Sequence, residues 1–139
     1  MSTHTNRATV AEAFEGWMNG TRSITSLLAD ELSWEIVGNS AASKRYESKQ
    51  QFTDEVLHLF GQRFSTPFRP TVISGIYEDS DTVIVFWDGK GIALDGLPYI
   101  NTYAWFLTMR GGFVVRAVAF YDSIAFNDLW SRVQPRDEG

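Results

Sequence analysis

The N-terminal part of the chain places hydrophobic residues at helical spacing. Thr9 and Glu12 fit a capping box, in which the two side chains would satisfy exposed backbone N–H groups of the first turn. An apolar stripe follows at intervals of three and four residues, made of Val10, Phe14, Trp17 and Met18. The pattern predicts a helix that begins at Thr9 and ends at Gly20, preceded by a flexible tail over residues 1–8.

Two further helices are expected before the main run of strands. A short helix is predicted over 23–29. A capping box at Ser48 and Gln51 opens the other helix, which continues with Phe52, Val56, Leu59 and Phe60 and ends at 66–67. Between these helices the chain alternates between apolar and polar residues. This alternation predicts a strand over 32–37 whose inner face carries Leu32, Trp34 and Ile36.

From residue 68 onward the helical spacing gives way to β-branched and aromatic runs. Strands are predicted over 71–77, 82–87, 99–109 and 113–121. Short turns join them, so consecutive strands should be antiparallel neighbours. Asp88-Gly89 fits either a hairpin turn or a bulge within one long strand, and the bulge is preferred. A final helix is predicted over 123–133.

Helices followed by a strand meander predict an α+β fold with the helices on one face of the sheet. Hydrophobic residues make up 44% of the 139 residues and charged residues 21%, which is typical of a folded chain. Neither a repeat nor a linker is evident, so one domain over 1–139 is expected. Aromatic residues reach 14%, and their large rings can fill a core or line a pocket for a flat ligand.

Charge and composition exclude several classes of function. The net charge is -5 and no Lys/Arg cluster occurs, so nucleic acid is not an expected partner. The chain has no Cys, and its two His, His4 and His58, are isolated, so neither a metal nor a cofactor is expected. No signal-peptide pattern and no apolar run of the ~20 residues that span a bilayer is present. A cytoplasmic protein without a membrane partner is therefore expected.

Three local stretches and the order of elements carry a family resemblance. The stretches are 32–38, 96–105 and 120–123. With them the chain resembles the nuclear transport factor 2-like superfamily, in its SnoaL-like or ketosteroid-isomerase-like branch. The resemblance implies a cone-shaped, curved antiparallel (mixed) sheet, of the cystatin-like roll type, with N-terminal helices on its concave face around an apolar pocket. It also implies a homodimer through the outer face of the sheet.

The functions within this superfamily are diverse, and the matched positions depart from the known mechanisms. Ketosteroid isomerases use a carboxylate base and a protonated Asp, and their positions match Ile36 and Ala104 here. One acid of the epoxide hydrolases of this fold matches Ala119. Neither reaction is therefore expected to run as known. The same matching points Ala104 and Phe106 inward, and Asn101 and Tyr103 outward.

Asp122 is the main candidate for acid–base chemistry, with Tyr121 beside it. SnoaL-like cyclases carry an acid near the end of the last strand, and at an apolar pocket mouth the pKa of a carboxylate is raised. The competing interpretation is that Asp122 caps the final helix, and this interpretation is preferred. Asp88 is a second candidate if the bulge aims it at the pocket, although an exposed side chain is preferred.

Three functions follow from these patterns. The pocket is expected to be lined by Phe14, Trp17, Trp34, Ile36, Phe60, Ala104, Phe106, Ala119 and Tyr121. The first function, preferred on family grounds, is a cofactor-independent isomerase, cyclase or dehydratase acting on a small lipophilic molecule of polyketide or steroid type. The alternatives are a non-catalytic protein that binds a small hydrophobic ligand, and a structural dimer.

Overall fold

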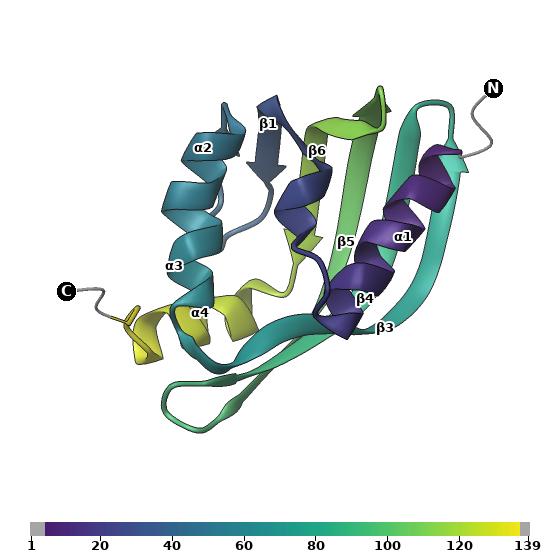
Figure 1. Ribbon diagram of the computed structural model, residues 1–139. Coiled ribbons are helices and arrows are strands. Elements are labelled where there is room, and N and C mark those ends of the chain that lie inside the picture. Colours follow the sequence, from purple (N-terminus) through teal and green to yellow (C-terminus); the bar gives the residue numbers. More distant parts are fainter. Residues whose placement is uncertain (1–4, 137–139) are drawn as a thin grey trace.

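The computed structural model describes residues 5–136, and in this range one curved sheet of six strands carries the fold (Figure 1). The strands are β1 (Leu28–Ile36), β2 (Arg45–Tyr46), β3 (Phe64–Asp79), β4 (Thr82–Ala93), β5 (Pro98–Arg110) and β6 (Phe113–Tyr121). Their order in the sheet is β2-β1-β6-β5-β4-β3. The β1–β6 pair is parallel and the other pairs are antiparallel, so the sheet is mixed.

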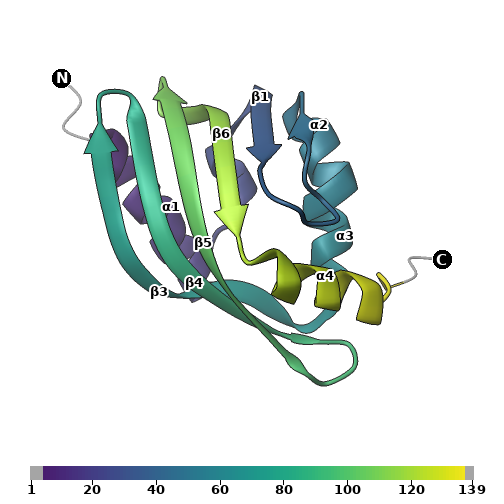
Figure 2. The same ribbon diagram turned by 180° about the vertical axis from the view of Figure 1, so that it is seen from behind.

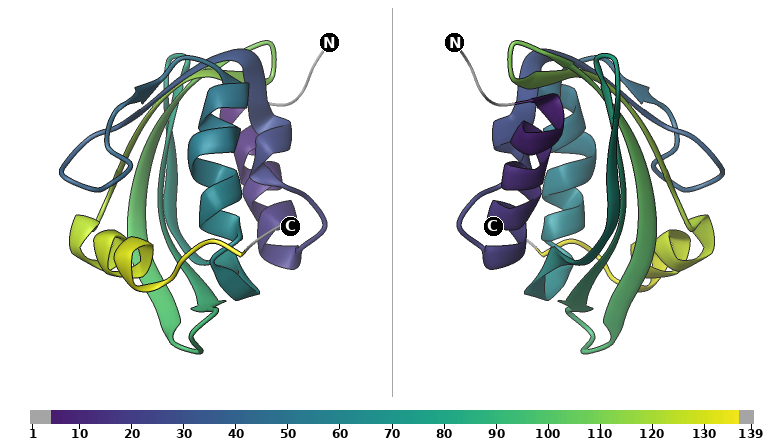
Figure 3. Two further views of the ribbon diagram at one scale, coloured as in Figure 1. Left: turned by 90° about the vertical axis from the view of Figure 1, so that its left-hand side faces the viewer. Right: turned by 90° about the vertical axis from the view of Figure 1, so that its right-hand side faces the viewer.

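The helices cover the hollow side of this sheet and one of its ends. They are α1 (Asn6–Asn19), a 3₁₀ turn η1 (Ile24–Leu27), α2 (Lys49–Phe52), a π-helical turn η2 (Thr53–Leu57), α3 (His58–Gly61) and α4 (Ser123–Arg132). Figure 3 shows the strands bending around α1 and the α2–η2–α3 helix, and Figure 2 shows α4 across the end of β6. The predicted α+β class and the curved sheet with helices on its concave face are confirmed. None of the described helices is both long and apolar enough to cross a bilayer.

The first helix begins earlier than predicted. Thr5, rather than Thr9, is the N-cap, and its hydroxyl accepts a hydrogen bond of 3.0 Å from the backbone N–H of Ala8. Part of the predicted tail is therefore helical, while residues 1–4, including His4, lie outside the described range. The predicted end is correct, because Gly20 adopts φ 75° and its N–H donates to carbonyls of the last turn.

Strand pairing overrides two of the predicted helix ends. The segment 23–29 forms only the η1 turn, because Leu28 already pairs with Val114 of β6. The helix capped by Ser48 ends at Gly61, and β3 begins at Phe64. Two prolines thus lie within β3. They are tolerated because β3 is an edge strand, where a missing N–H breaks no inner ladder.

Asp88-Gly89 is neither a turn nor a bulge of its own strand. β4 runs through both residues and pairs with β5 without a shift in register. The extra residue lies in β3, since Pro70 is opposite Gly89 while Val72 is opposite Asp88. Asp88 is half-buried and accepts a hydrogen bond of 2.8 Å from the Thr102 hydroxyl. The bulge is real, but it is in the partner strand and does not aim Asp88 at the hollow side.

Candidate functional site

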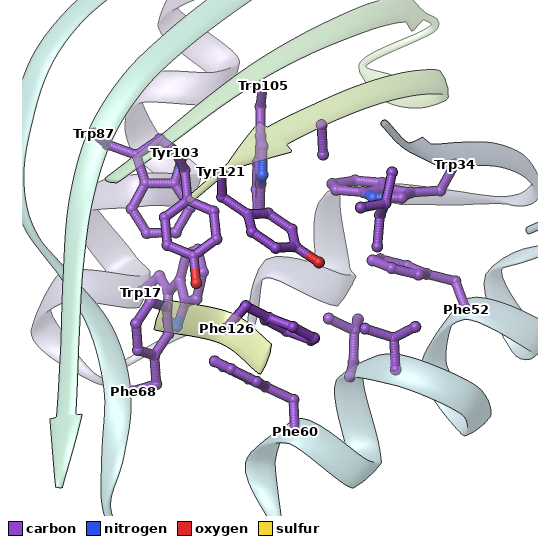
Figure 4. A pocket seen from close by; sticks show the side chains of 14 residues that line it. Trp17, Trp34, Phe52, Phe60, Phe68, Trp87, Tyr103, Trp105, Tyr121 and Phe126 are labelled. Atoms are coloured by element: carbon purple, nitrogen blue, oxygen red, sulfur yellow. The ribbon is translucent and has the colours of Figure 1, made fainter. Parts of the chain in front are cut away.

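A small aromatic cavity of about 80 Å³ lies between the concave face of the sheet and the helices (Figure 4). The sheet contributes Trp34, Ile36, Phe68, Trp87, Tyr103, Trp105, Ala119 and Tyr121. The helices contribute Trp17, Phe52, Val56, Leu57, Phe60 and Phe126. The rings pack against one another by edge and by face. The Trp34 ring stacks on Phe52 at 4.4 Å, for example, and meets Trp105 edge-on at 4.9 Å.

The cavity depends on which face of β5 points inward, and here the sequence prediction was wrong. Tyr103 and Trp105 are buried and line the cavity, whereas Phe106 is 41% exposed and Ala104 lies on the same outer face. A shift of one residue in a strand exchanges its two faces. The large residues at every second position from Tyr99 to Met109 were the signal for the true inner face.

The other predicted lining residues divide into two groups. Those that the structure places in the cavity wall are Trp17, Trp34, Ile36, Phe60, Ala119 and Tyr121. Phe14 is buried one layer behind the wall, with its ring 5.7 Å from Trp17 and 5.3 Å from Trp87. Its position supports the indoles from the α1 side without giving it contact with the cavity.

The π-helical turn contributes to the site in a way that helical periodicity alone does not predict. Val56 and Leu57 both line the cavity, although adjacent residues in a regular α-helix point about 100° apart. The wider turn over Thr53–Leu57 changes the phase between Phe52 and Phe60, so that both of these rings also reach the cavity. Such turns occur frequently at functional sites.

Two tyrosines bring hydroxyl groups to the apolar wall, and both are already paired. The Tyr103 and Tyr99 hydroxyls are 2.8 Å apart, and Asn101 donates to the Tyr99 hydroxyl at 2.7 Å. Asn101 and Tyr103 thus face inward, against the prediction. The Tyr121 hydroxyl lies 2.8 Å from the Ser40 hydroxyl. Burial raises the pKa of Tyr99 to about 12 and the pKa values of Tyr103 and Tyr121 further above their ordinary value, so these phenols are neutral at physiological pH.

Asp122 does not enter the cavity. Its carboxylate accepts a hydrogen bond of 3.0 Å from the N–H of Ile124 and caps α4, and the residue is exposed. The preferred capping interpretation is confirmed, and the expectation of a pocket acid at this position is wrong. Tyr121, the residue before it, does line the cavity. Within the described residues, the wall contains no Asp, Glu, His, Lys or Arg.

Two indole N–H groups of the wall lack an acceptor. The Nε1 atoms of Trp34 and Trp87 are buried and have no hydrogen-bond partner within residues 5–136. An unpaired buried donor is unusual and destabilising, because it loses water without regaining a hydrogen bond. Within the described residues, these are the buried side-chain donors of the wall for which no acceptor is present.

An outer cleft of about 350 Å³ lies beside the cavity, between η1, α3 and β3. Four side chains line both spaces: Trp17, Leu57, Phe60 and Phe68. We call these four residues the partition. All four are half-buried, in contrast to Trp87 behind them, which is fully buried. Across the described residues, no group of three or more acidic, His or Cys side chains is placed to bind a metal ion.

Comparison with known proteins extends the description of the fold. No family model and no curated protein matches the chain. Among solved structures, it is similar to an NTF2-like protein from Anabaena variabilis ATCC 29413, with a TM-score of 0.70 and 16% identity over 91% of this chain and 97% of that one. It is also similar to a candidate SnoaL-like polyketide cyclase from Jannaschia sp. CCS1, with a TM-score of 0.69 and 16% identity over 94% and 98% of the two chains. A third is TerC co-crystallised with polyporic acid, with a TM-score of 0.69 and 18% identity over 89% and 96%.

Proposed function

We propose that this chain, which has the nuclear transport factor 2-like fold, binds a small, flat, apolar molecule in the aromatic cavity without transforming it. The observation that carries the proposal is the composition of the wall. Its described side chains are aromatic or aliphatic, and its two phenols are neutral. Binding pockets for small molecules are mostly apolar, with few polar groups.

The same wall argues against acid–base catalysis. A general base has to lie within hydrogen-bonding reach of the proton it removes. Ile36 and Ala119, which match acid positions of related enzymes, line the cavity with side chains that exchange no proton. Of the two candidate acids, Asp122 is exposed and caps α4, and Asp88 does not line the cavity. A binding function needs none of these groups, so it agrees better with the residues present.

The ligand must displace side chains in order to enter. A cavity of about 80 Å³ is smaller than the ~150 Å³ that holds benzene and than the ~300–1,000 Å³ of common ligand pockets. The partition supplies the missing room, because moving it would join the cavity to the cleft of about 350 Å³. Its residues are half-buried and lose less contact on moving than a fully buried ring would. TerC, which shares the fold, was crystallised with polyporic acid, so the fold accommodates organic ligands.

Titration with indane, a flat bicyclic hydrocarbon, tests the proposal. At roughly −0.5 kcal/mol for each of about nine heavy atoms, the dissociation constant is expected on the order of 1 mM. Ala119→Leu puts three more carbon atoms into the cavity and is expected to abolish binding. Ala104→Leu makes the same change on the outer face and should leave binding intact. Equal affinity of both variants for indane, with both folded, would remove the cavity as the binding site.

We also propose that a second copy covers the outer face of the sheet. Phe86, Phe106 and Phe120 are 47%, 41% and 51% exposed there. The register places them side by side, since Ala104 is opposite both Phe86 and Phe120. Exposed apolar patches of this kind mark interaction surfaces. Sedimentation equilibrium should give a dimer that Phe106→Glu dissociates and that Glu15→Lys, on the far side on α1, does not; a monomeric parent chain would refute the proposal.

A further inference from the structure

We infer that the ligand of the aromatic cavity is a neutral, flat ketone or quinone whose carbonyl oxygen accepts a hydrogen bond from the indole N–H of Trp34. The inference rests on the proposed function and adds the polar chemistry of the ligand to it. Its basis is the contrast between two unpaired indole donors, of which Trp34 is the less enclosed, and a wall that is otherwise apolar or already paired.

Trp34 is held rigidly with its donor unused. The residue is 2% exposed, and its ring is fixed by Phe52 on one face and by the edge contact with Trp105. Figure 4 shows the ring edge-on at the side of the cavity, next to Phe52. Within the part of the chain that the structure describes, no acceptor reaches its Nε1 atom. A ligand oxygen that accepted this hydrogen bond would recover the free energy that is lost when folding buries this donor without an acceptor.

The hydroxyl groups of the wall are less available to a ligand. Tyr103 is paired with Tyr99, and Tyr121 is paired with Ser40. Each phenol hydroxyl therefore already has one partner, although a hydroxyl can make more than one hydrogen bond. The indole N–H has no partner at all, so an acceptor placed beside it gives the larger net gain.

Trp87 carries the other unpaired N–H but is enclosed by rings. Tyr103 stacks on it at 4.4 Å, and Trp17, Trp105 and Phe14 lie 5.2, 5.0 and 5.3 Å from it. By contrast, Trp34 faces small side chains on the neighbouring strand. Ala117 is opposite Trp34 and Ala119 is opposite Ile36. Trp34 therefore has fewer aromatic neighbours than Trp87 and small side chains on one side, so less has to move for a ligand atom to reach it.

The charge of the wall selects a neutral acceptor. An anion moved from water into an apolar site loses several kcal/mol unless a cation or several donors replace the water. The described wall contains neither Lys nor Arg. A carboxylate or phosphate would therefore be rejected, whereas a carbonyl group loses far less hydration and needs a single donor. Aromatic rings make up most of the wall, which favours a ligand with a flat skeleton.

A matched pair of probes isolates this hydrogen bond. Indane and 1-indanone share one bicyclic skeleton and differ by a carbonyl group. Trp34→3-benzothienylalanine keeps the ring shape and replaces the N–H with sulfur. We expect the ratio of the dissociation constant of indane to that of 1-indanone to fall on the order of tenfold in this variant. The difference in hydration between the probes cancels, because both are measured against both proteins.

The same replacement at Trp87 is the matched control and should leave the ratio unchanged. The five Trp give five indole signals in a nitrogen–proton spectrum. The Trp34 signal, identified by its loss in the variant, should move downfield with 1-indanone and not with indane. Two outcomes would overturn the inference and leave the proposed function intact. In the first, indane binds but the ratio of the two dissociation constants is the same in the Trp34 variant as in the parent chain. In the second, the ratio falls only in the Trp87 variant. Absence of binding by both probes would overturn both.

Discussion

Replacing Gly89 by Ala tests how firmly Phe68 closes the cavity. Gly89 lies on β4 directly under the Phe68 ring. A Cβ atom at residue 89 would overlap the Cζ atom of that ring and lie 2.8 and 2.9 Å from its two Cε atoms. Real Cβ atoms do not approach other atoms so closely, so the ring has to move. Phe68 belongs to the partition. Its displacement should therefore have two effects at once: a loss of packing, which lowers the stability, and easier entry of a ligand into the cavity.

The magnitude follows from the contacts that Phe68 makes. Its ring lies 5.1 Å from Phe60, 5.6 Å from Tyr99 and 5.8 Å from Tyr103. Each such aromatic pair contributes about 0.5–1.5 kcal/mol, and overpacking costs about 1–3 kcal/mol. We expect Gly89→Ala to lower the free energy of unfolding by about 2 kcal/mol, which corresponds to a fall in Tm of roughly 8 °C. Indane should also associate faster than with the parent chain.

Urea denaturation and stopped-flow binding measure the two effects. Gly61→Ala is the matched control, because a Cβ atom there meets nothing within 4 Å at the end of α3. It should be neutral or stabilise the chain by up to about 1 kcal/mol. If the unfolding free energies of the two variants agreed within about 0.5 kcal/mol, Phe68 could not be packed on Gly89, and the account of the partition would fail.

Two further predictions concern the cap of α4 and the buried phenols. Asp122→Ala should lower the unfolding free energy by about 1 kcal/mol, whereas Asp122→Asn, which can still cap the helix, should retain most of the stability. Neither variant should change the affinity for indane. A loss of indane binding in both variants would place the carboxylate in the site after all. Burial raises the pKa of Tyr99 to about 12 and the pKa of Tyr103 well above its ordinary value. The unfolded chain therefore loses these protons first, so the stability is fully present below pH 10 and falls as the pH rises toward 12. Denaturation at pH 9 and pH 11 checks this fall, which Tyr103→Phe should reduce by up to about 1.4 kcal/mol per pH unit; an identical fall in the variant would contradict the assignment.

Local chemistry alone was enough to predict several elements. Ser48 caps its helix as the capping box indicated, Gly20 ends α1 in the left-handed conformation, and Asp122 caps α4. The helical stripe and the strand alternation also predicted that Trp17 and Trp34 face inward, and both line the cavity. These features depend on neighbours within a few residues along the chain, so their physical causes can be read directly from the sequence.

The tertiary structure decided the features that depend on partners far along the chain. Pairing with β6 extended β1 back to Leu28. Packing against α1, β1 and β4 placed Trp105, rather than Phe106, on the inner face of β5. The volume of the cavity and the unpaired N–H of Trp34 were also decided at this level. The composition predicted an aromatic interior, but only the packing determines how much space the rings leave empty. That space is the small difference between the volume that the sheet and helices enclose and the volume that side chains from distant segments fill.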